Sequence, residues 1–165
     1  MAEKLETPTV KDLMITDVIT VTRDASLGDV ITLLITHDVP AAPVIDDKDG
    51  GKKLLGFITE RDCLEYFSNE IYYGNPDVSV QSMMRLPLCA NPEMDVFSMA
   101  TIFTQYPYRH LPVVKKKQQL VGVISRRGVL RALYEFEHKV CIDKAKQHKC
   151  LMDFRELVNL RFIIK

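Results

Sequence analysis

The sequence predicts an α/β (α+β) fold in which two β-α-β-β-α repeats pack sheet to sheet about a pseudo-twofold axis, followed by a C-terminal helical extension. Three motifs occur twice in the same order, at offsets of 70, 69 and 66 residues. Hydrophobic residues make up 47% of the 165 residues, which is enough for a packed core. The motif pairs are VKDLM and VQSMM (from Val10 and Val80), APVI and LPVV (from Ala42 and Leu111), and LGFIT and VGVIS (from Leu55 and Val121).

The motifs divide the chain into repeat 1 (residues 9–70), a linker (71–79), repeat 2 (80–136) and the extension (137–165). Two copies are too few for a solenoid, so the repeats are expected to form one compact module. The net charge of zero hides an asymmetry between them. Residues 1–79 hold 7 basic and 15 acidic residues (net −8), and residues 80–165 hold 15 basic and 7 acidic residues (net +8).

Composition disfavours several classes of protein. No run of 18 apolar residues is present and the N-terminus is charged, so a soluble, cytoplasmic protein without membrane contact is expected. The four cysteines form no CxxC pair, which favours reduced thiols over a disulfide framework. Neutral net charge makes a dedicated nucleic-acid binder unlikely on composition alone, although the basic second half leaves that function open.

In repeat 1, residues 18–22 alternate as a strand does, and Ser26 with Asp29 forms an N-cap pattern that begins a helix. A short strand through Pro43, an apolar strand over residues 54–58 and a helix over residues 60–68 follow. The first helix is expected to bury the apolar positions Leu27, Val30, Ile31, Leu34 and Ile35.

Repeat 2 predicts the same elements, with Asp95 as the helix cap, a strand through Pro112 and a last helix from residue 126 past residue 135. The apolar positions expected on its first helix are Val96, Met99, Ala100, Ile102 and Phe103. The extension is amphipathic and predicts one or two helices, whose apolar face packs on the module or on a second copy of the chain.

The order of these motifs, ending in Gly56-Phe-Ile-Thr-Glu-Arg-Asp62, resembles a cystathionine β-synthase (CBS) domain, and the tandem resembles a CBS pair, or Bateman module. The resemblance covers about residues 9–136. It implies ligand clefts between the repeats, most commonly for adenosine nucleotides. It also implies dimerisation through helices, so a homodimer is expected.

The family's ribose motif, Gly-x-x-Thr/Ser-x-x-Asp, matches Gly56, Thr59 and Asp62. The resemblance implies that the Asp62 carboxylate accepts two hydrogen bonds from the ribose diol, with Thr59 beside it. Thr59 and Asp62 also form an N-cap pattern that needs no ligand. Repeat 2 has Gly128 at the position of the carboxylate, which makes a second nucleotide held in the same way doubtful.

A basic cluster in repeat 2 is the candidate phosphate site. The gamma subunit of AMP-activated protein kinase has basic residues at positions that match Arg109, His110 and Arg127, which implies that the phosphate lies at repeat 2 while the ribose lies at repeat 1. Ordinary surface positions, including ion pairs of Arg126 or Arg127 with Glu60 or Glu65, are the alternative. The candidate adenine pocket comprises Ile15, Thr16, Val18, Val39 and Pro40, each of which is equally suited to the core.

No catalytic motif is present, so an enzyme, a cofactor and a metal are not expected. The spacing of His138, Cys141, His148 and Cys150 matches no structural zinc site, and Cys63 is expected to be a packed side chain rather than a nucleophile. The sequence thus predicts a regulatory module that binds AMP, or ADP or ATP, and signals to an unidentified partner protein or to its own dimer. A protein-interaction scaffold with vestigial clefts and a nucleic-acid binder are the alternatives.

Overall fold

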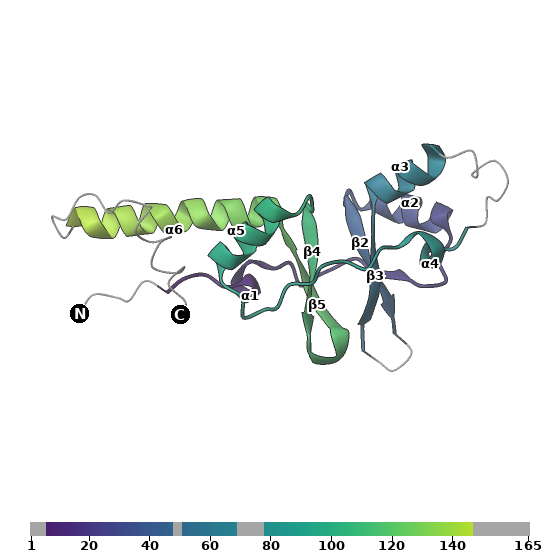
Figure 1. The fold of residues 1–165 in the computed structure, drawn as a ribbon, viewed down its shortest axis with the longest axis horizontal. Helices are drawn as coiled ribbons and strands as arrows, with labels where there is room; N and C mark the ends of the chain where they lie inside the picture. Colours follow the sequence, from purple (N-terminus) through teal and green to yellow (C-terminus); the bar gives the residue numbers. More distant parts are fainter. Residues whose placement is uncertain (1–5, 48–50, 69–77, 147–165) are drawn as a thin grey trace.

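The computed structural model describes residues 6–47, 51–68 and 78–146, which form two similar halves around one mixed sheet (Figure 1). The strands follow the order β1-β2-β3-β5-β4. They are β1 (Val21–Thr22), β2 (Ala41–Asp46), β3 (Lys53–Thr59), β4 (His110–Lys115) and β5 (Gln119–Ser125). The helices are α1 (Val10–Leu13), α2 (Leu27–Thr36), α3 (Glu60–Ser68), α4 (Val80–Met83), α5 (Val96–Gln105) and α6 (Arg126–Lys146), with a short 3₁₀ turn, η2 (Lys116–Gln118).

The two hairpins of the sheet repeat each other in register. In β2–β3, Ala41 pairs with Thr59, and in β4–β5 His110 pairs with Ser125. Each hairpin has a register shift at the equivalent place, after Val44 and after Val113. The halves meet where Lys53 of β3 pairs with Gln119 of β5. The predicted fold of two pseudo-twofold-related repeats is therefore confirmed.

The N-caps of α2 and α5, the equivalent helices of the two halves, are those that the sequence predicts. At the start of α2, the Ser26 hydroxyl accepts a hydrogen bond from the Asp29 amide (3.2 Å) and donates one to the Asp29 carboxylate (2.7 Å). Asp95 accepts the amides of Phe97 and Ser98 at the start of α5. The expectation that Ile35 is buried is wrong: its side chain is 75% exposed on the last turn of α2.

The first strand is also shorter than expected, because only residues 21–22 of the predicted 18–22 pair with β2. β1 lies at one edge of the sheet and pairs with β2 alone.

The short helix at the start of each repeat packs into the core of the other repeat. Val10 of α1 is buried among residues of repeat 2 and its amide donates to the Met94 carbonyl (2.8 Å). Val80 of α4 is buried among residues of repeat 1 and its amide donates to the Ala25 carbonyl (2.9 Å). In Figure 1, α4 accordingly lies beside α2 and α3, whereas α1 lies with α5 and α6. The two halves thus exchange their first segments.

Each exchanged segment then crosses a strand of the half that receives it. Ile15 exchanges two backbone hydrogen bonds with Val123 of β5 (both 2.9 Å), and Arg85 does the same with Phe57 of β3 (2.9 and 3.0 Å). A glycine of each strand lies under the crossing: a Cβ at Gly56 would lie 2.6 Å from the Met84 sulfur, and one at Gly122 would lie 2.8 Å from the Ile15 carbonyl oxygen. These close approaches explain why the repeated strand motif contains glycine.

Helix α6 passes residue 136, the predicted end of repeat 2, without a break and reaches Lys146. The rest of the predicted extension (147–165) and most of the linker (71–77) lie outside the described residues. Leu130, Tyr134 and Ile142 of α6 are at least half exposed. None of the helices in the described ranges is long and apolar enough to cross a membrane.

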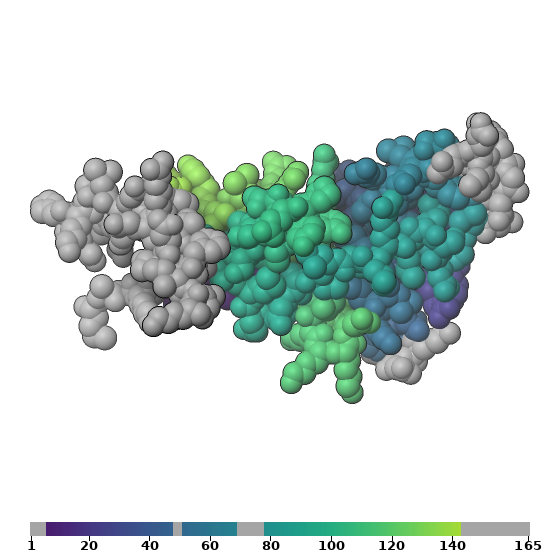
Figure 2. All heavy atoms as spheres, in the orientation of Figure 1, coloured from purple at the N-terminus to yellow at the C-terminus, as the bar shows by residue number. Residues whose placement is uncertain are grey.

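The turn that joins β4 to β5 carries Lys115, Lys116 and Lys117 and projects from the surface (Figure 2). Lys117 and Gln118 both adopt positive φ angles (62° and 59°) there, a conformation that sequence patterns of lysine and glutamine do not predict.

Candidate functional site

The Thr59–Asp62 pair lies where β3 ends and α3 begins, and it forms a complete helix cap. The Asp62 amide donates to the Thr59 hydroxyl oxygen (3.2 Å). In return, Oδ2 of Asp62 accepts the Thr59 amide (2.9 Å) and the Thr59 hydroxyl (2.6 Å). The cap that the sequence predicts is therefore present, and it holds the carboxylate in one orientation.

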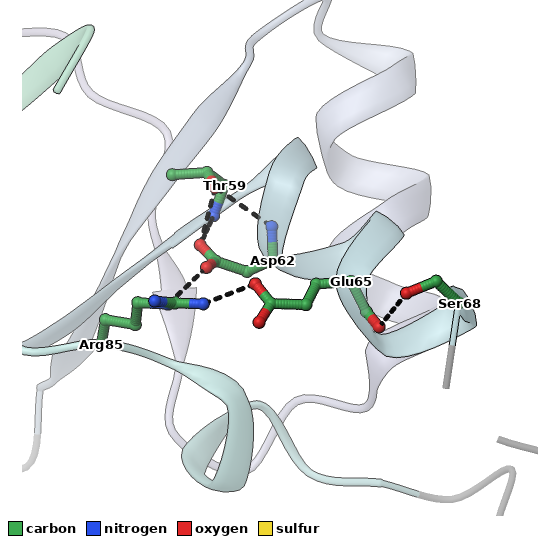
Figure 3. A network of polar contacts seen from close by, with 5 residues as sticks. All are labelled: Thr59, Asp62, Glu65, Ser68 and Arg85. Carbon is green, nitrogen blue, oxygen red and sulfur yellow. Dashed lines mark hydrogen bonds and ion pairs between the residues drawn. The ribbon is translucent and has the colours of Figure 1, made fainter. Parts of the chain in front are cut away.

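Asp62 is only 8% exposed and is the buried charged side chain among the residues described. A buried carboxylate needs a cation or several hydrogen-bond donors. Figure 3 shows that Arg85 supplies the cation: its Nε lies 2.7 Å from Oδ1 of Asp62, and its Nη2 lies 2.6 Å from Oε2 of Glu65. The guanidinium group therefore joins two acidic residues one turn apart on α3, and both oxygens of Asp62 have partners.

We call this junction of β3 and α3 the Thr59–Asp62 corner. The equivalent corner of repeat 2, where β5 ends and α6 begins, has the hydroxyl group and lacks both charges. The Gly128 amide donates to Oγ of Ser125 (3.0 Å), as the Asp62 amide does to Thr59. Gly128 replaces the carboxylate, and Ile15, 70 residues before Arg85, replaces the guanidinium group. The acidic and the basic side chain thus occur together at one corner and are both absent from the other.

Of the predicted phosphate residues, His110 is half-buried at the start of β4, while Arg109 and Arg127 are exposed. The carbonyl of Arg109 accepts the Arg126 amide (2.9 Å), which ties β4 to the start of α6. Burial lowers the pKa of His110, the Arg109 charge lowers it further, and the Glu60 charge opposes both effects. Glu60 is the first residue of α3, so His110 of repeat 2 lies within electrostatic range of the Thr59–Asp62 corner.

The predicted adenine residues divide between the two corners. The Pro40 carbonyl accepts the Glu60 amide (3.0 Å), so Pro40 and the half-buried Val39 lie beside the Thr59–Asp62 corner. Ile15 instead pairs with Val123 of β5, two residues before Ser125, and Thr16 and Val18 follow it along the chain. Of the five predicted adenine residues, Pro40 is thus tied to α3 and Ile15 to β5.

Sequence reasoning did not find Arg85, nor the exposed Leu86 and Leu88 that follow it. The offset of 70 residues aligns these three positions with Ile15, Thr16 and Val18. The sequence therefore contains this alignment, but the exchange of first segments decides that Ile15 pairs with β5 and Arg85 with β3.

Two further groups considered in the sequence have ordinary surroundings. Cys63 is buried in the core of repeat 1, where burial and the Asp62 charge raise the pKa of its thiol. The ring of His138 contacts Tyr134 edge-on along α6. In the described ranges no three His, Cys, Asp or Glu side chains gather as metal ligands would, and His148 and Cys150 lie outside those ranges.

The family model of the CBS domain matches the chain twice, over residues 10–69 and 78–135. The chain belongs to the CBS domain family. The two matches correspond to the two repeats, so the CBS pair predicted from the motifs is confirmed. The Thr59–Asp62 corner lies in the first CBS domain, and the basic residues lie in the second.

Two relatives extend beyond the CBS pair. The inosine-5′-monophosphate dehydrogenase of Methanocaldococcus jannaschii is 28% identical over 122 residues, which are 73% of this chain and 22% of that enzyme. The uncharacterized protein MJ1225 of the same organism is 27% identical over 152 residues, which are 92% of this chain and 50% of that protein. The chain thus spans half or less of the length of these two relatives.

A solved structure matches over most of both chains. CBSX2, crystallised in complex with AMP, is 29% identical to this chain and superimposes with a TM-score of 0.68. The match covers 78% of this chain and 98% of CBSX2. The CBS pair is therefore present here at nearly the full extent of that protein.

Proposed function

We propose that this CBS pair is a regulatory, non-catalytic module that binds an adenosine nucleotide, preferably AMP, between its repeats. Asp62 accepts the ribose hydroxyls, and Arg109, His110 and Arg127 face the phosphate. ADP and ATP are the alternative ligands. Occupancy is passed to a partner protein or to a second copy of the chain, because a ligand regulates only if it binds two states with different affinity.

The observation that carries this proposal is the buried Asp62 carboxylate, held by Thr59 where β3 ends and α3 begins. The effect of the Glu60 charge on the His110 pKa supports a basic residue of repeat 2 on the same side of the module. A carboxylate suits a cis-diol, since it offers two acceptors at matching separation, and basic groups suit a phosphate. The AMP complex of CBSX2, at 29% identity, supports the same class of ligand. For the adenine we propose Val39 and Pro40, which lie beside this corner, and the exposed Leu86 and Leu88, which follow Arg85 along the chain.

Calorimetry with AMP, ADP, ATP, NAD and S-adenosylmethionine tests the proposal, with wild type compared with Asp62→Asn. Loss of the charged acceptor removes about 1.5 to 3 kcal/mol of binding free energy, so AMP affinity should fall at least about tenfold. Asp29→Asn is the matched control, because Asp29 makes the same capping contacts with Ser26 at an exposed site. AMP binding that survives Asp62→Asn unchanged would show that the ribose lies elsewhere.

One observation favours the alternative of a scaffold that binds no ligand. Thr59 and Arg85 already occupy both oxygens of Asp62, so the corner is satisfied as it stands. A scaffold predicts no shift of the melting temperature with any of the five compounds, whereas a nucleotide at a hundredfold excess over Kd stabilises the fold by about 2.7 kcal/mol. Differential scanning fluorimetry distinguishes the two functions.

We also propose that the chain forms a homodimer. Leu64 of α3 is 68% exposed and Leu130 and Tyr134 of α6 are 69% and 64% exposed, and contact with a second copy would cover such side chains. Sedimentation at several concentrations, with and without AMP, tests both the dimer and its response to the ligand. A single monomeric species at every concentration contradicts this part of the proposal.

A further inference from the structure

The backbone of Arg85 is fixed by hydrogen bonds, whereas its side chain is largely exposed to solvent. Its main chain is fixed by two hydrogen bonds, because its amide donates to the Phe57 carbonyl of β3 (3.0 Å) and its carbonyl accepts from the Phe57 amide (2.9 Å). Its side chain is 63% exposed, while the carboxylate that it contacts is 8% exposed. Solvent can therefore reach the guanidinium group, and the group can leave Asp62 without any change in the strand pairing.

The hydrogen-bonding capacity of Asp62 is nearly used. A carboxylate offers about four acceptor positions, two on each oxygen. Two donors of Thr59 occupy Oδ2, at 2.6 and 2.9 Å. Nε of Arg85 occupies Oδ1 at 2.7 Å, and the second nitrogen extends toward Glu65. A cis-diol that donates two hydrogen bonds thus needs the position that Arg85 holds.

The fold does not require this ion pair. In repeat 2, Ile15 makes the same backbone pairing with β5, and Gly128 occupies the third position of α6 below the same kind of hydroxyl cap. The crossing and the cap therefore form without either charge. What Arg85 and Asp62 add to the corner of repeat 1 is an electrostatic contact that a ligand can replace.

We propose that Arg85 is an intramolecular competitor for the ribose-binding carboxylate. It holds Asp62 in the empty module, and the diol of an adenosine ligand displaces it. The displacement removes one of the two ion pairs that Arg85 makes, so binding weakens the contact between the α4 segment of repeat 2 and α3 of repeat 1. Arg85 thereby lowers ligand affinity and makes the 2′ and 3′ hydroxyls together a requirement for entry. The inference rests on the proposed function, since it assigns Asp62 to the ribose.

The test compares wild type with Arg85→Gln, using AMP, adenosine and 2′-deoxyadenosine in calorimetry. Removing a competitor raises the binding-competent fraction, so AMP and adenosine should both bind about fivefold tighter. 2′-Deoxyadenosine donates one hydrogen bond less than adenosine and therefore displaces Arg85 less readily. In Arg85→Gln no cation has to be displaced, so the affinity of 2′-deoxyadenosine relative to adenosine should rise. Arg61→Gln, which removes a neighbouring positive charge of α3, is the control for the general loss of attraction to phosphate and should leave adenosine binding unchanged.

The possible results separate the inference from the proposed function. If Arg85→Gln binds AMP and adenosine as wild type does, or more weakly, Arg85 is not a competitor, while the nucleotide site stands. A gain for AMP without one for adenosine also overturns the inference, because competition at the ribose does not depend on the phosphate. If wild type shows no binding and Arg85→Gln shows it, the competitor is upheld in its strongest form. If neither protein binds any of the three compounds, the proposed function fails and the inference falls with it.

Discussion

The corners at Asp62 and at Gly128 have the same backbone and differ in charge. At both, a hydroxyl caps a helix, a glycine of the strand lies under a crossing segment, and that segment pairs through two backbone hydrogen bonds. Only the first corner has the carboxylate and the guanidinium group. The shared features are therefore those that the fold needs. The features that differ are the carboxylate that binds the proposed ligand and the arginine that competes with that ligand.

The largest expected effect tests the shared part of this comparison. Gly122→Ala should destabilise the protein by about 3 kcal/mol, because the new Cβ meets the Ile15 carbonyl oxygen at 2.8 Å and a main-chain atom in a paired segment cannot move aside. Gly56→Ala should cost less, about 2 kcal/mol, since the new Cβ meets side-chain atoms of Met84 (Sδ at 2.6 Å, Cγ at 2.8 Å and Cβ at 3.1 Å), which can move further than a paired carbonyl group. Urea unfolding of both variants measures the difference. Equal losses would mean that the two crossings are equally adaptable.

The fold could be predicted because the sequence patterns of its helix caps and strands are local and occur in both repeats. The Ser26 and Asp95 caps, the α3 boundaries and the strand through Pro112 follow from spacing within a few residues. The exchange of α1 and α4 could not be predicted, because VKDLM and VQSMM are nearly the same motif and either fits either core. That one ambiguity explains why the pairing of Ile15 with β5 was not predicted and why Arg85 was missed.

The next prediction restores one charge to the second corner. Gly128→Asp should stabilise the protein by about 1 kcal/mol, because it removes a helical glycine and completes the capping box with Ser125. It should create no second AMP site, since Pro40 and Ala41 stand where repeat 2 has the basic pair Arg109 and His110. Thermal unfolding and the stoichiometry of AMP binding are the measurements.

The double variant Gly128→Asp with Ile15→Arg is the matched control for that change. If Gly128→Asp alone destabilises the protein and the added arginine repairs the loss, the carboxylate depends on its ion pair for stability. The Asp62–Arg85 contact would then be a structural unit, contrary to its proposed role as a contact that the ligand replaces. Stabilisation by the single variant supports the division between fold and ligand that the two corners indicate.

The smallest expected effect concerns pH and the His110 imidazole. Burial and Arg109 lower its pKa, so without ligand the unfolded chain takes up the proton first, and the stability that His110 contributes is lost as the pH falls below its ordinary value of about 6.5. A bound phosphate raises this pKa, so AMP binding takes up protons. AMP affinity relative to adenosine should therefore rise about twofold to threefold between about pH 7.5 and about pH 6.5, above the second pKa of the phosphate near 6.

His110→Gln keeps a hydrogen-bond donor at the start of β4 and cannot be protonated, so its ratio of AMP to adenosine affinity should not change over the same range. Calorimetry in two buffers of different ionisation enthalpy counts the protons taken up on binding. Wild type should show uptake with AMP and none with adenosine. Proton uptake that persists in His110→Gln would place the titrating group elsewhere and would contradict the proposed contact between His110 and the phosphate.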